Sequence, residues 1–332
     1  MSASLVGSEM CIRDRFKGDD GKFHMLISTK KGGKGSLAEF VSDDLKNWTD
    51  NGVFMTMMWD RFYECPDLFK MGDYWYLVYS EIHHTVRRVQ YFKGRTLDEL
   101  KACTANDAGI WPDAHEGFLD SRGLYAGKTA SDGTNRYLWG WCPTRSGKDN
   151  TAVGASPAEP EWAGNLVCYK LIQHEDGTLT LGQVDAVSEK YNQDVAVEVK
   201  ESQNMTEADG TYTLAGNVEQ PDAYMLMGRL GNHNKISFTV TTSNKWDKFG
   251  ISMVRGSDSK KYYTMVVNPE DENNRKVNFE EQGVEGKGFI AGIDGYVFAR
   301  PADNVYNVTI YTDNSICVMY INDVCSYTNR IY

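Results

Sequence analysis

Glu64 is the acidic residue whose surroundings best suit acid–base chemistry. Tyr63 precedes it, Cys65-Pro66 follows it, and Phe69 lies on the same short stretch. Apolar and aromatic neighbours favour the protonated form of a carboxylic acid over its charged form. A group that protonates the departing oxygen of a glycoside needs such surroundings, because it must still hold its proton near neutral pH. Judged from residue types alone, Glu64 could equally be a carboxylate that ends a strand before a turn at Pro66.

A longer string around Glu64 carries a family resemblance. Residues 64–69 read Glu-Cys-Pro-Asp-Leu-Phe, and residues 74–80 read Tyr-Trp-Tyr-Leu-Val-Tyr-Ser. Together they resemble the acid/base motif of glycoside hydrolase family 32, which contains invertases, levanases, inulinases and sucrose-6-phosphate hydrolases. The resemblance implies that Glu64 is the general acid/base. It also implies that Cys65 belongs to the substrate-binding group and helps to set the surroundings of the acid.

A second stretch resembles the same family. Residues 119–129 read Leu-Asp-Ser-Arg-Gly-Leu-Tyr-Ala-Gly-Lys-Thr, and residues 136–141 read Arg-Tyr-Leu-Trp-Gly-Trp. The first of these is similar to the family's Asp-x-x-x-x-Tyr-Ala-x-Lys-Thr strand. The resemblance implies that Asp120 and Tyr125 approach the substrate. Without it, Asp120 could be a turn residue and Tyr125 a core aromatic.

The nucleophile expected from the family has no counterpart in the sequence. In the family it is an Asp in a Trp-Met-Asn-Asp-Pro-Asn-Gly-type motif near the amino terminus, and no such string occurs here. A retaining glycosidase needs two carboxyl groups about 5 to 5.5 Å apart, one on each side of the reaction centre. Because Glu64 supplies only one of them, we predict that this chain is an inactive fragment of a longer enzyme.

The family's transition-state stabiliser lies in an Arg-Asp-Pro motif, and Arg13-Asp14-Arg15 stands in the corresponding place. The resemblance implies that Asp14 stabilises the transition state and that Arg13 binds substrate hydroxyl groups. Arg15 replaces the proline of the motif. However, residues 1–15 have neither strand alternation nor a signal-peptide pattern. They resemble translated sequencing-adapter residue, so we expect a non-native leader there and a truncated N-terminus.

The remaining sequence predicts an all-β protein of two domains. From residue 16 to 190, aromatic and β-branched runs alternate with Gly/Asp/Asn turns in units of roughly 40 to 50 residues, typical of β-propeller blades. One large twisted sandwich would also fit this spacing. From residue 191 to 332 the runs alternate more strictly, as in an antiparallel β-sandwich, and the last run is cut short. The family resemblance implies a five-bladed propeller with an incomplete N-terminal blade, followed by the sandwich.

Composition and charge argue against several partners. The 332-residue chain has a formal net charge of −11, whereas nucleic acids and anionic membrane surfaces require a basic face. No apolar run of about 18 residues occurs, so we expect no membrane insertion. The seven cysteines lack Cys-x-x-Cys and Cys/His spacing, so no metal site is expected. The family resemblance implies no cofactor.

The resemblance implies a retaining glycosidase that releases fructose from sucrose or from fructans such as levan and inulin. One alternative is a glycosidase of the related propeller group that acts on arabinose- or xylose-containing glycans. Another is a carbohydrate-binding protein that kept the propeller without its chemistry. A parent that degrades polysaccharides would be extracellular or periplasmic, and a sucrose or sucrose-phosphate hydrolase would be cytoplasmic. The sequence leaves the oligomeric state open.

Overall fold

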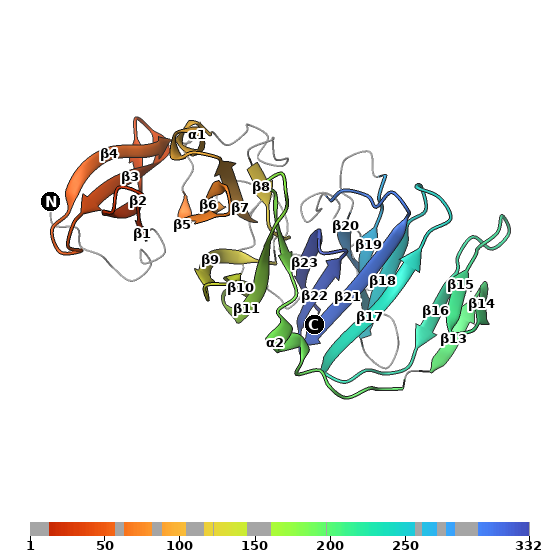
Figure 1. Ribbon diagram of the computed structural model, residues 1–332. Coiled ribbons are helices and arrows are strands. Elements are labelled where there is room, and N and C mark those ends of the chain that lie inside the picture. The colour runs from red at the N-terminus through yellow and green to blue at the C-terminus, as the bar shows by residue number, and fades with distance from the viewer. Residues whose placement is uncertain are drawn as a thin grey trace.

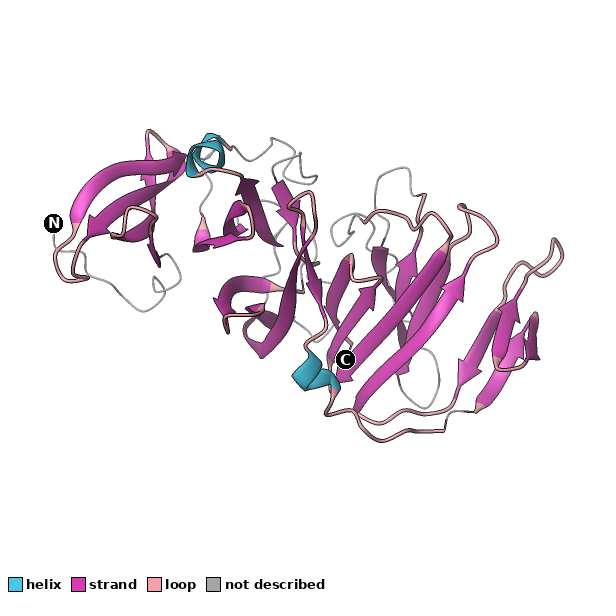
Figure 2. Cartoon of the chain, in the orientation of Figure 1, coloured by secondary structure: helices cyan, strands magenta, loops and turns pink. Residues whose placement is uncertain are grey.

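The computed structural model describes residues 13–56, 63–81, 88–103, 116–121, 123–144, 161–196, 198–255, 261–270, 277–282 and 298–331. Strands dominate these residues (Figures 1 and 2), which confirms the all-β expectation. The helices are short: α1 (Leu97–Ala102) follows the N-cap residue Thr96, whose side chain accepts the backbone N–H of Glu99, and α2 (Asp185–Ser188) is a single turn. Within the described part of the chain, no helix is long and apolar enough to cross a membrane.

Three four-stranded antiparallel sheets form the amino-terminal part (Figure 1). The first contains β1 (Arg13–Lys17), β2 (Phe23–Lys31), β3 (Lys34–Ser42) and β4 (Thr49–Thr56). The second contains β5 (Glu64–Met71), β6 (Tyr74–Glu81), β7 (Arg88–Gly94) and β8 (Glu116–Phe118). The third contains β9 (Tyr125–Ser131), β10 (Arg136–Thr144), β11 (Glu161–Gln173) and β12 (Leu179–Gly182). Each sheet joins strands in their order along the chain, which is the topology of a propeller blade.

Aromatic side chains of the central strands fill the space between the blades. Tyr76 and Tyr91 of the second blade are buried in one cluster with Leu138 and Leu171 of the third. Burial raises the pKa of Tyr76 to about 12, and its hydroxyl donates to the carbonyl of Gly177 at 2.8 Å. The aromatic residues that favoured strands in the sequence thus also join one blade to the next.

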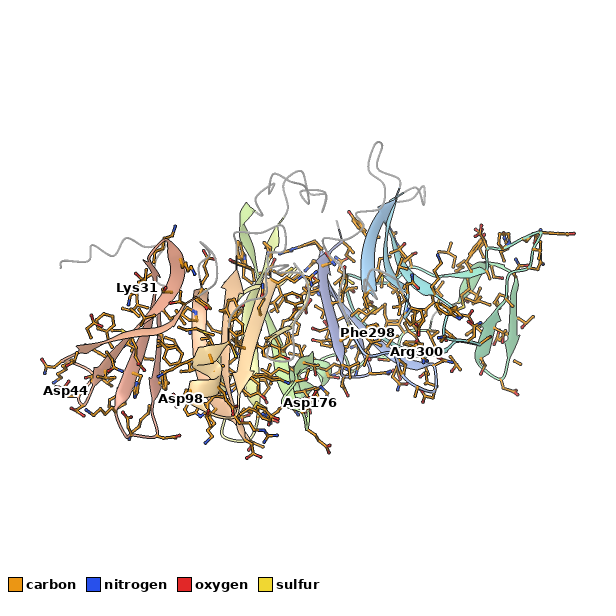
Figure 3. All side chains as sticks on the ribbon, turned by 90° about the horizontal axis from the view of Figure 1, so that it is seen from above. Lys31, Asp44, Asp98, Asp176, Phe298 and Arg300 are labelled. Carbon is orange, nitrogen blue, oxygen red and sulfur yellow. The ribbon has the colours of Figure 1, made fainter. Side chains whose placement is uncertain are left out.

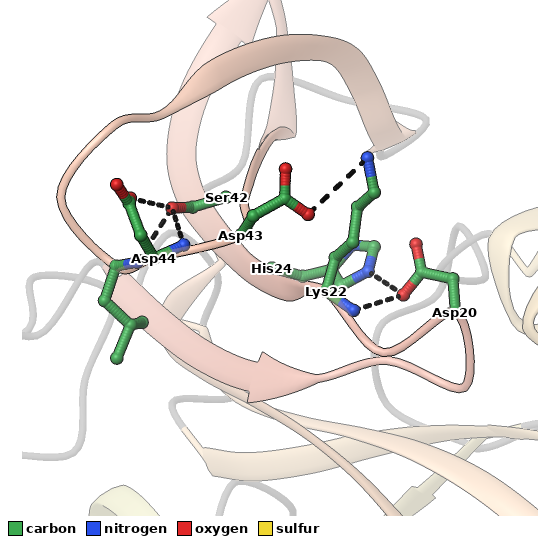
Figure 4. Close-up of polar contacts among 7 residues, drawn as sticks. Asp20, Lys22, His24, Ser42, Asp43 and Asp44 are labelled. Carbon is green, nitrogen blue, oxygen red and sulfur yellow. Dashed lines mark hydrogen bonds and ion pairs between the residues drawn. The ribbon is translucent and has the colours of Figure 1, made fainter.

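Short polar side chains set the turns at the rim of the first blade (Figure 4). Asp44 Oδ1 accepts hydrogen bonds from the Ser42 hydroxyl at 3.1 Å and from the backbone N–H of Asn47 at 2.8 Å. Such bonds from backbone N–H groups hold the pKa of Asp44 well below its usual range. On the neighbouring hairpin, His24 Nε2 lies 3.1 Å from Asp20 Oδ1. These contacts fix the turns that separate the strands.

The carboxy-terminal part is a β-sandwich. One sheet has the order β17 (His233–Thr241), β21 (Val305–Asp313), β22 (Ile316–Ile321), β23 (Cys325–Arg330), and the other contains β18 (Phe249–Arg255), β19 (Lys261–Val267) and β20 (Val277–Gln282). Two small sheets precede them: β13 (Val199–Gln203) with β16 (Tyr224–Met227), and β14 (Met205–Ala208) with β15 (Thr211–Leu214). Buried residues of β19 and β22, such as Met265 and Met319, form the core between the two large sheets.

The sandwich packs directly on the third blade. Strands β22 and β23 are buried along their whole length, because one face of the sheet meets the second sheet of the sandwich and the other meets the propeller. Val318 and Tyr320 share a core with Leu124 and Leu138 of the blade. In the view from above (Figure 3), Asp44, Asp98 and Asp176 mark the propeller part and Arg300 marks the sandwich.

Candidate active site

Glu64 begins β5, at a place where the strand is irregular. Glu64 pairs with Ser80 and Asp67 with Val78, so three steps along β5 match two steps along β6. The extra residue is a β-bulge, and Cys65 within it has a φ of 49°. A non-glycine residue in this left-handed region is strained, and bulges of this kind redirect the side chains beside them. The backbone therefore turns at the position where the sequence predicts the acid.

Strand β9 carries a matching irregularity at Tyr125. Tyr125 pairs with Trp141 and Lys128 with Trp139, so three steps along β9 again match two on the partner strand. Ala126 lies in the bulge with a φ of 54°. Two adjacent blades thus each place a bulge directly after a polar side chain.

The two bulged strands bring Glu64 and Tyr125 into contact. The Tyr125 hydroxyl donates a hydrogen bond to Glu64 Oε2. Tyr125 is buried, whereas Glu64 keeps partial exposure. A neutral donor on one carboxyl oxygen fixes the rotamer of the side chain and leaves the second oxygen available to a ligand. This arrangement suits a carboxyl group that exchanges protons with a bound molecule.

Lys128 lies at the centre of a second group, the Lys128 cluster, formed with Asp14, Pro66 and Asp67. Lys128 Nζ donates to the carbonyl of Pro66 at 2.5 Å and to Asp14 Oδ1 at 3.2 Å. It also lies 3.8 Å from Asp67 Oδ1. Burial raises the pKa of Asp67, and the ammonium group of Lys128 opposes that shift. One cation therefore compensates two carboxyl groups that water reaches poorly.

The Lys128 cluster connects three blades. Asp14 belongs to β1, Asp67 to β5 and Lys128 to β9. Asp14 Oδ2 also accepts the backbone N–H of Leu68 at 2.5 Å, and Asp67 Oδ2 accepts the backbone N–H of Thr129 at 2.6 Å. These bonds fix the strand that carries Glu64 from both sides.

Three of the remaining predicted site residues lie near these groups or next to them in sequence. Cys65 is buried in the bulge beside Glu64. Asp14 is buried and belongs to the Lys128 cluster, and its strand β1 includes residues 13–15 of the expected leader. The backbone of Arg13 belongs to the same strand, and its side chain lies outside the described residues, as do residues 1–12. The structure thus brings Glu64, Tyr125 and the Lys128 cluster onto neighbouring strands.

The side chain of Asp120 contacts the sandwich domain. This side chain is fully buried, and both carboxyl oxygens accept hydrogen bonds from β23 of the sandwich, namely from Ser326 and Thr328. Burial raises the pKa of Asp120. The contacts of this carboxyl group therefore lie within the interface of the two domains. Along the chain, Asp120 precedes Tyr125, whereas Lys128 follows it.

Sequence reasoning assigned no role to Lys128 or Asp67, although both lie in the strings that carried the family resemblance. Their contact joins positions 61 residues apart, which no local pattern reports. Among the described residues, no group of three or more His, Cys, Asp or Glu side chains could hold a metal ion.

A propeller joined to a β-sandwich, with a carboxyl group presented from a bulged blade strand, is an arrangement that a carbohydrate-cleaving enzyme can use. Family comparisons specify the class. Residues 8–184 match the Glycosyl hydrolases family 32 N-terminal domain, and residues 177–332 match the GH32, BT1760-like, C-terminal domain. The chain belongs to glycosyl hydrolase family 32, and its relatives are β-fructofuranosidase-like glycosidases.

Two named relatives match the chain over part of their length. A fructan 6-exohydrolase of Beta vulgaris is 25% identical over 160 residues, which cover 44% of this chain and 25% of that protein. The β-fructofuranosidase, insoluble isoenzyme CWINV2, of Arabidopsis thaliana is 30% identical over 171 residues, which cover 45% of this chain and 27% of that protein. The matched region is thus only about a quarter of each relative.

Solved structures confirm the fold. Sucrose-6-phosphate hydrolase from Lactobacillus gasseri superposes with a TM-score of 0.64 at 17% identity, covering 96% of this chain and 60% of that one. Fructan 1-exohydrolase IIa from Cichorium intybus, in complex with 1-kestose, gives a TM-score of 0.60 at 15% identity, covering 96% and 65%. The predicted propeller followed by a sandwich is therefore confirmed, and the described residues hold three four-stranded blades of it.

Proposed function

We propose that the parent protein is a retaining glycosidase that releases fructose from sucrose or from a fructan such as levan or inulin. The observation that carries the proposal is the contact between Tyr125 and Glu64 on two bulged strands of a family 32 fold. Relatives that are named for fructans or for β-fructofuranosidase activity support the substrate class. Because the chain spans about a quarter of those relatives, the activity is proposed for the whole parent protein.

In the proposed reaction Glu64 acts twice. It first protonates the oxygen that leaves the anomeric carbon of a terminal fructosyl unit, and later removes a proton from the water that resolves the covalent intermediate. The Tyr125 hydroxyl holds one oxygen of the carboxyl group, so that the other can face the leaving oxygen.

The second carboxyl group of the reaction is proposed to come from an upstream segment of the parent protein. Retention requires a nucleophile on the opposite side of the anomeric carbon from the acid. Asp14 is not proposed for that role, because the Lys128 ammonium and the Leu68 N–H hold both of its oxygens. Each Asp14 oxygen keeps a further lone pair, so we propose that Asp14, together with Arg13, contacts hydroxyl groups of the sugar ring as positive charge develops on it. Cys65 would line the same site beside Glu64.

Sugar release from sucrose, inulin and levan by the intact parent protein tests the proposal, together with a Glu64→Gln variant. We expect free fructose from the parent and a loss of about 10²-fold to 10⁴-fold in the variant, because a general acid contributes a factor of this size. Glu175→Gln is the matched control, since Glu175 lies exposed in a turn of the third blade. The 332-residue chain alone is expected to release no fructose.

Two results would contradict the proposal. Release of arabinose from arabinan, with no fructose from the three substrates, would assign the parent to the related propeller glycosidases. Binding of fructan oligosaccharides without any hydrolysis would identify a carbohydrate-binding protein instead. The NMR signals of the first-formed sugar report whether the anomeric configuration is retained, and inversion would exclude the covalent intermediate.

A further inference from the structure

The loop of residues 119–124 connects the sandwich to the proposed site. We propose that the sandwich domain positions Tyr125, and through it Glu64, by holding this loop, with Asp120 as the positioning residue. The inference rests on the proposed function only in so far as Glu64 is the acid/base.

Asp120 binds β23 through both of its carboxyl oxygens. Its Oδ1 accepts the backbone N–H of Thr328 at 2.7 Å. Its Oδ2 accepts the Thr328 hydroxyl at 2.9 Å and the Ser326 hydroxyl at 2.8 Å. The backbone N–H of Ser121 donates to Oδ1 as well, at 2.5 Å. A fully buried carboxyl group with four donors has one stable orientation, because losing any of them leaves a buried polar group unpaired.

The backbone of the loop is held on the same strand. Ser326 Oγ also lies 3.1 Å from the carbonyl oxygen of Leu119, so its single proton is shared between that carbonyl and Asp120. The Ser121 hydroxyl donates to the carbonyl of Thr328. Gly123 packs so closely that an added Cβ atom would lie 2.0 Å from the Thr328 carbonyl oxygen. Described residues at the beginning, in the middle and near the end of the loop therefore contact β23, which leaves the loop little freedom to shift.

Tyr125 follows this loop without a spacer. Leu124 is fully buried in the core that the blade shares with Ile316 and Val318 of the sandwich. The next residue, Tyr125, begins β9 and donates to Glu64. A displacement of the loop would therefore move the hydroxyl group of Tyr125, and hydrogen bonds weaken steeply when their geometry changes. Asp120 acts on the acid through Tyr125 and does not touch the substrate.

If the interface served only to stabilise the fold, the loss of any one of its hydrogen bonds would affect Tyr125 equally. A pair of threonine substitutions distinguishes this case from a positioning role of Asp120. Thr328→Val removes the hydroxyl that binds Asp120. Thr180→Val removes a second hydroxyl at the domain interface, which donates to the carbonyl of Asp323 at 2.8 Å and does not touch the loop. Both threonines are buried. Both changes keep the side-chain volume and remove one hydrogen bond that the threonine donates across the domain interface. Each also removes a second contact of the Oγ1 atom, with the Tyr169 hydroxyl at 2.5 Å for Thr328 and with His174 Nε2 at 2.8 Å for Thr180.

The experiment labels Tyr125 of the 332-residue chain with 3-fluorotyrosine and records its ¹⁹F resonance. We expect the resonance to shift in Thr328→Val and to stay at the wild-type position in Thr180→Val. An unchanged resonance in a folded Thr328→Val variant, or equal shifts in both variants, would overturn the proposal. If Thr328→Val does not fold, Ser326→Ala takes its place under the same criterion, because it also removes a donor to Asp120.

Activity of the intact parent provides a second readout. We expect Thr328→Val to lower kcat about tenfold with little change in KM, since misplacing an acid affects the chemical step more than binding. Thr180→Val should leave both constants unchanged, and a fall in kcat of equal size there would contradict the positioning role. The fluorine measurement needs no turnover, so a parent without fructosidase activity would refute the proposed function and leave the positioning of Tyr125 to be judged on its own.

Discussion

The proposed chemistry depends on a contact between two residues that lie 61 positions apart, Glu64 and Tyr125. A hydrogen bond from a phenol to a carboxylate is charge-assisted and therefore stronger than one between neutral groups. This bond holds the carboxyl group in one orientation. Tyr125 therefore affects where the proton is delivered.

Tyr125→Phe in the intact parent should lower kcat/KM about 10-fold to 100-fold, which corresponds to the roughly 1.5 to 3 kcal/mol of a hydrogen bond to a charged group. The loss should appear mainly in kcat, because the carboxyl group without its donor is no longer held in one orientation for the chemical step. Initial rates over a series of substrate concentrations measure it.

Tyr311→Phe is the control for that substitution. Tyr311 lies in the sandwich and donates to Gln183 Oε1 at 2.7 Å, away from Glu64. Tyr311→Phe should leave kcat/KM unchanged. An unchanged kcat/KM in Tyr125→Phe would show that the phenol does not act on the acid.

The sequence named candidate site residues, but it did not predict the contacts between them. Glu64 stood in a specific string, and Tyr125 was expected near the substrate because of a second string. Asp120 belongs to that second string too, yet its carboxyl group turns to β23. Residue type alone does not show whether a side chain points to the proposed site or to the sandwich, because tertiary contacts orient the side chain of a loop residue.

At the scale of strands, β5 and β9 share one irregularity. Each has a bulge whose extra residue, Cys65 or Ala126, adopts a positive φ. Glycine is the usual residue for such a conformation, and neither strand has it there. The hydrophobic runs therefore predicted the strands, whereas the bulges that orient Glu64 and Tyr125 left no signal in residue type.

The Lys128 cluster links strands of three blades, and Lys128→Met tests how much this link stabilises the fold. The substitution keeps the aliphatic stem and removes the cation shared by Asp14 and Asp67, two carboxyl groups of low exposure. Breaking a buried ion pair costs several kcal/mol, but the Lys128 side chain is 40% exposed, so solvent screening reduces the loss. We expect the free energy of unfolding to fall by about 1 to 3 kcal/mol, measured by denaturant titration of the 332-residue chain.

Lys190→Met is the matched control for the Lys128 cluster, because Lys190 lies exposed beyond the short helix α2. A change within about 0.5 kcal/mol is expected there. Lys128→Arg should recover part of the lost stability, since a guanidinium group can still pair with carboxylates. Equal stability of Lys128→Met and the wild-type chain would show that the cluster does not hold the three strands together.

At the scale of the whole molecule, the two domains share a polar interface that contains a buried carboxyl group. A propeller followed by a sandwich was predicted from the sequence, but the packing of β22 and β23 against the third blade was not. Strands buried on both faces read as continuous apolar runs, and β23 instead reads Cys-Ser-Tyr-Thr-Asn-Arg. Three of its polar residues bind the propeller: Ser326 and Thr328 donate to Asp120, and Arg330 donates to the carbonyl of Cys142 at 2.7 Å.

This interface predicts how stability depends on pH. Burial raises the pKa of Asp120 above the value of about 3.9 that an unfolded chain gives it. Between those two values the folded state holds a proton that the unfolded state has lost, so stability falls as pH rises through that window. Asp120→Asn removes the titration. The difference in unfolding free energy between the wild-type chain and the variant should therefore decrease as pH rises from about 4 upward, with a slope of at most about 1.4 kcal/mol per pH unit.

Denaturant titrations of both chains over a pH series measure that slope, and Asp132→Asn provides a control of opposite sign. Hydrogen bonds from the backbone N–H groups of Asn135 and Thr134 lower the pKa of the exposed Asp132. Its contribution to stability is present above about pH 4 and is lost only as pH falls below that value. From pH 5 to 8 the wild-type chain and Asp132→Asn should differ by a constant amount. If the difference for Asp120→Asn is equally flat over the whole series, Asp120 is ionised in the folded state at every pH tested, and its donors on β23 outweigh the cost of burying its charge.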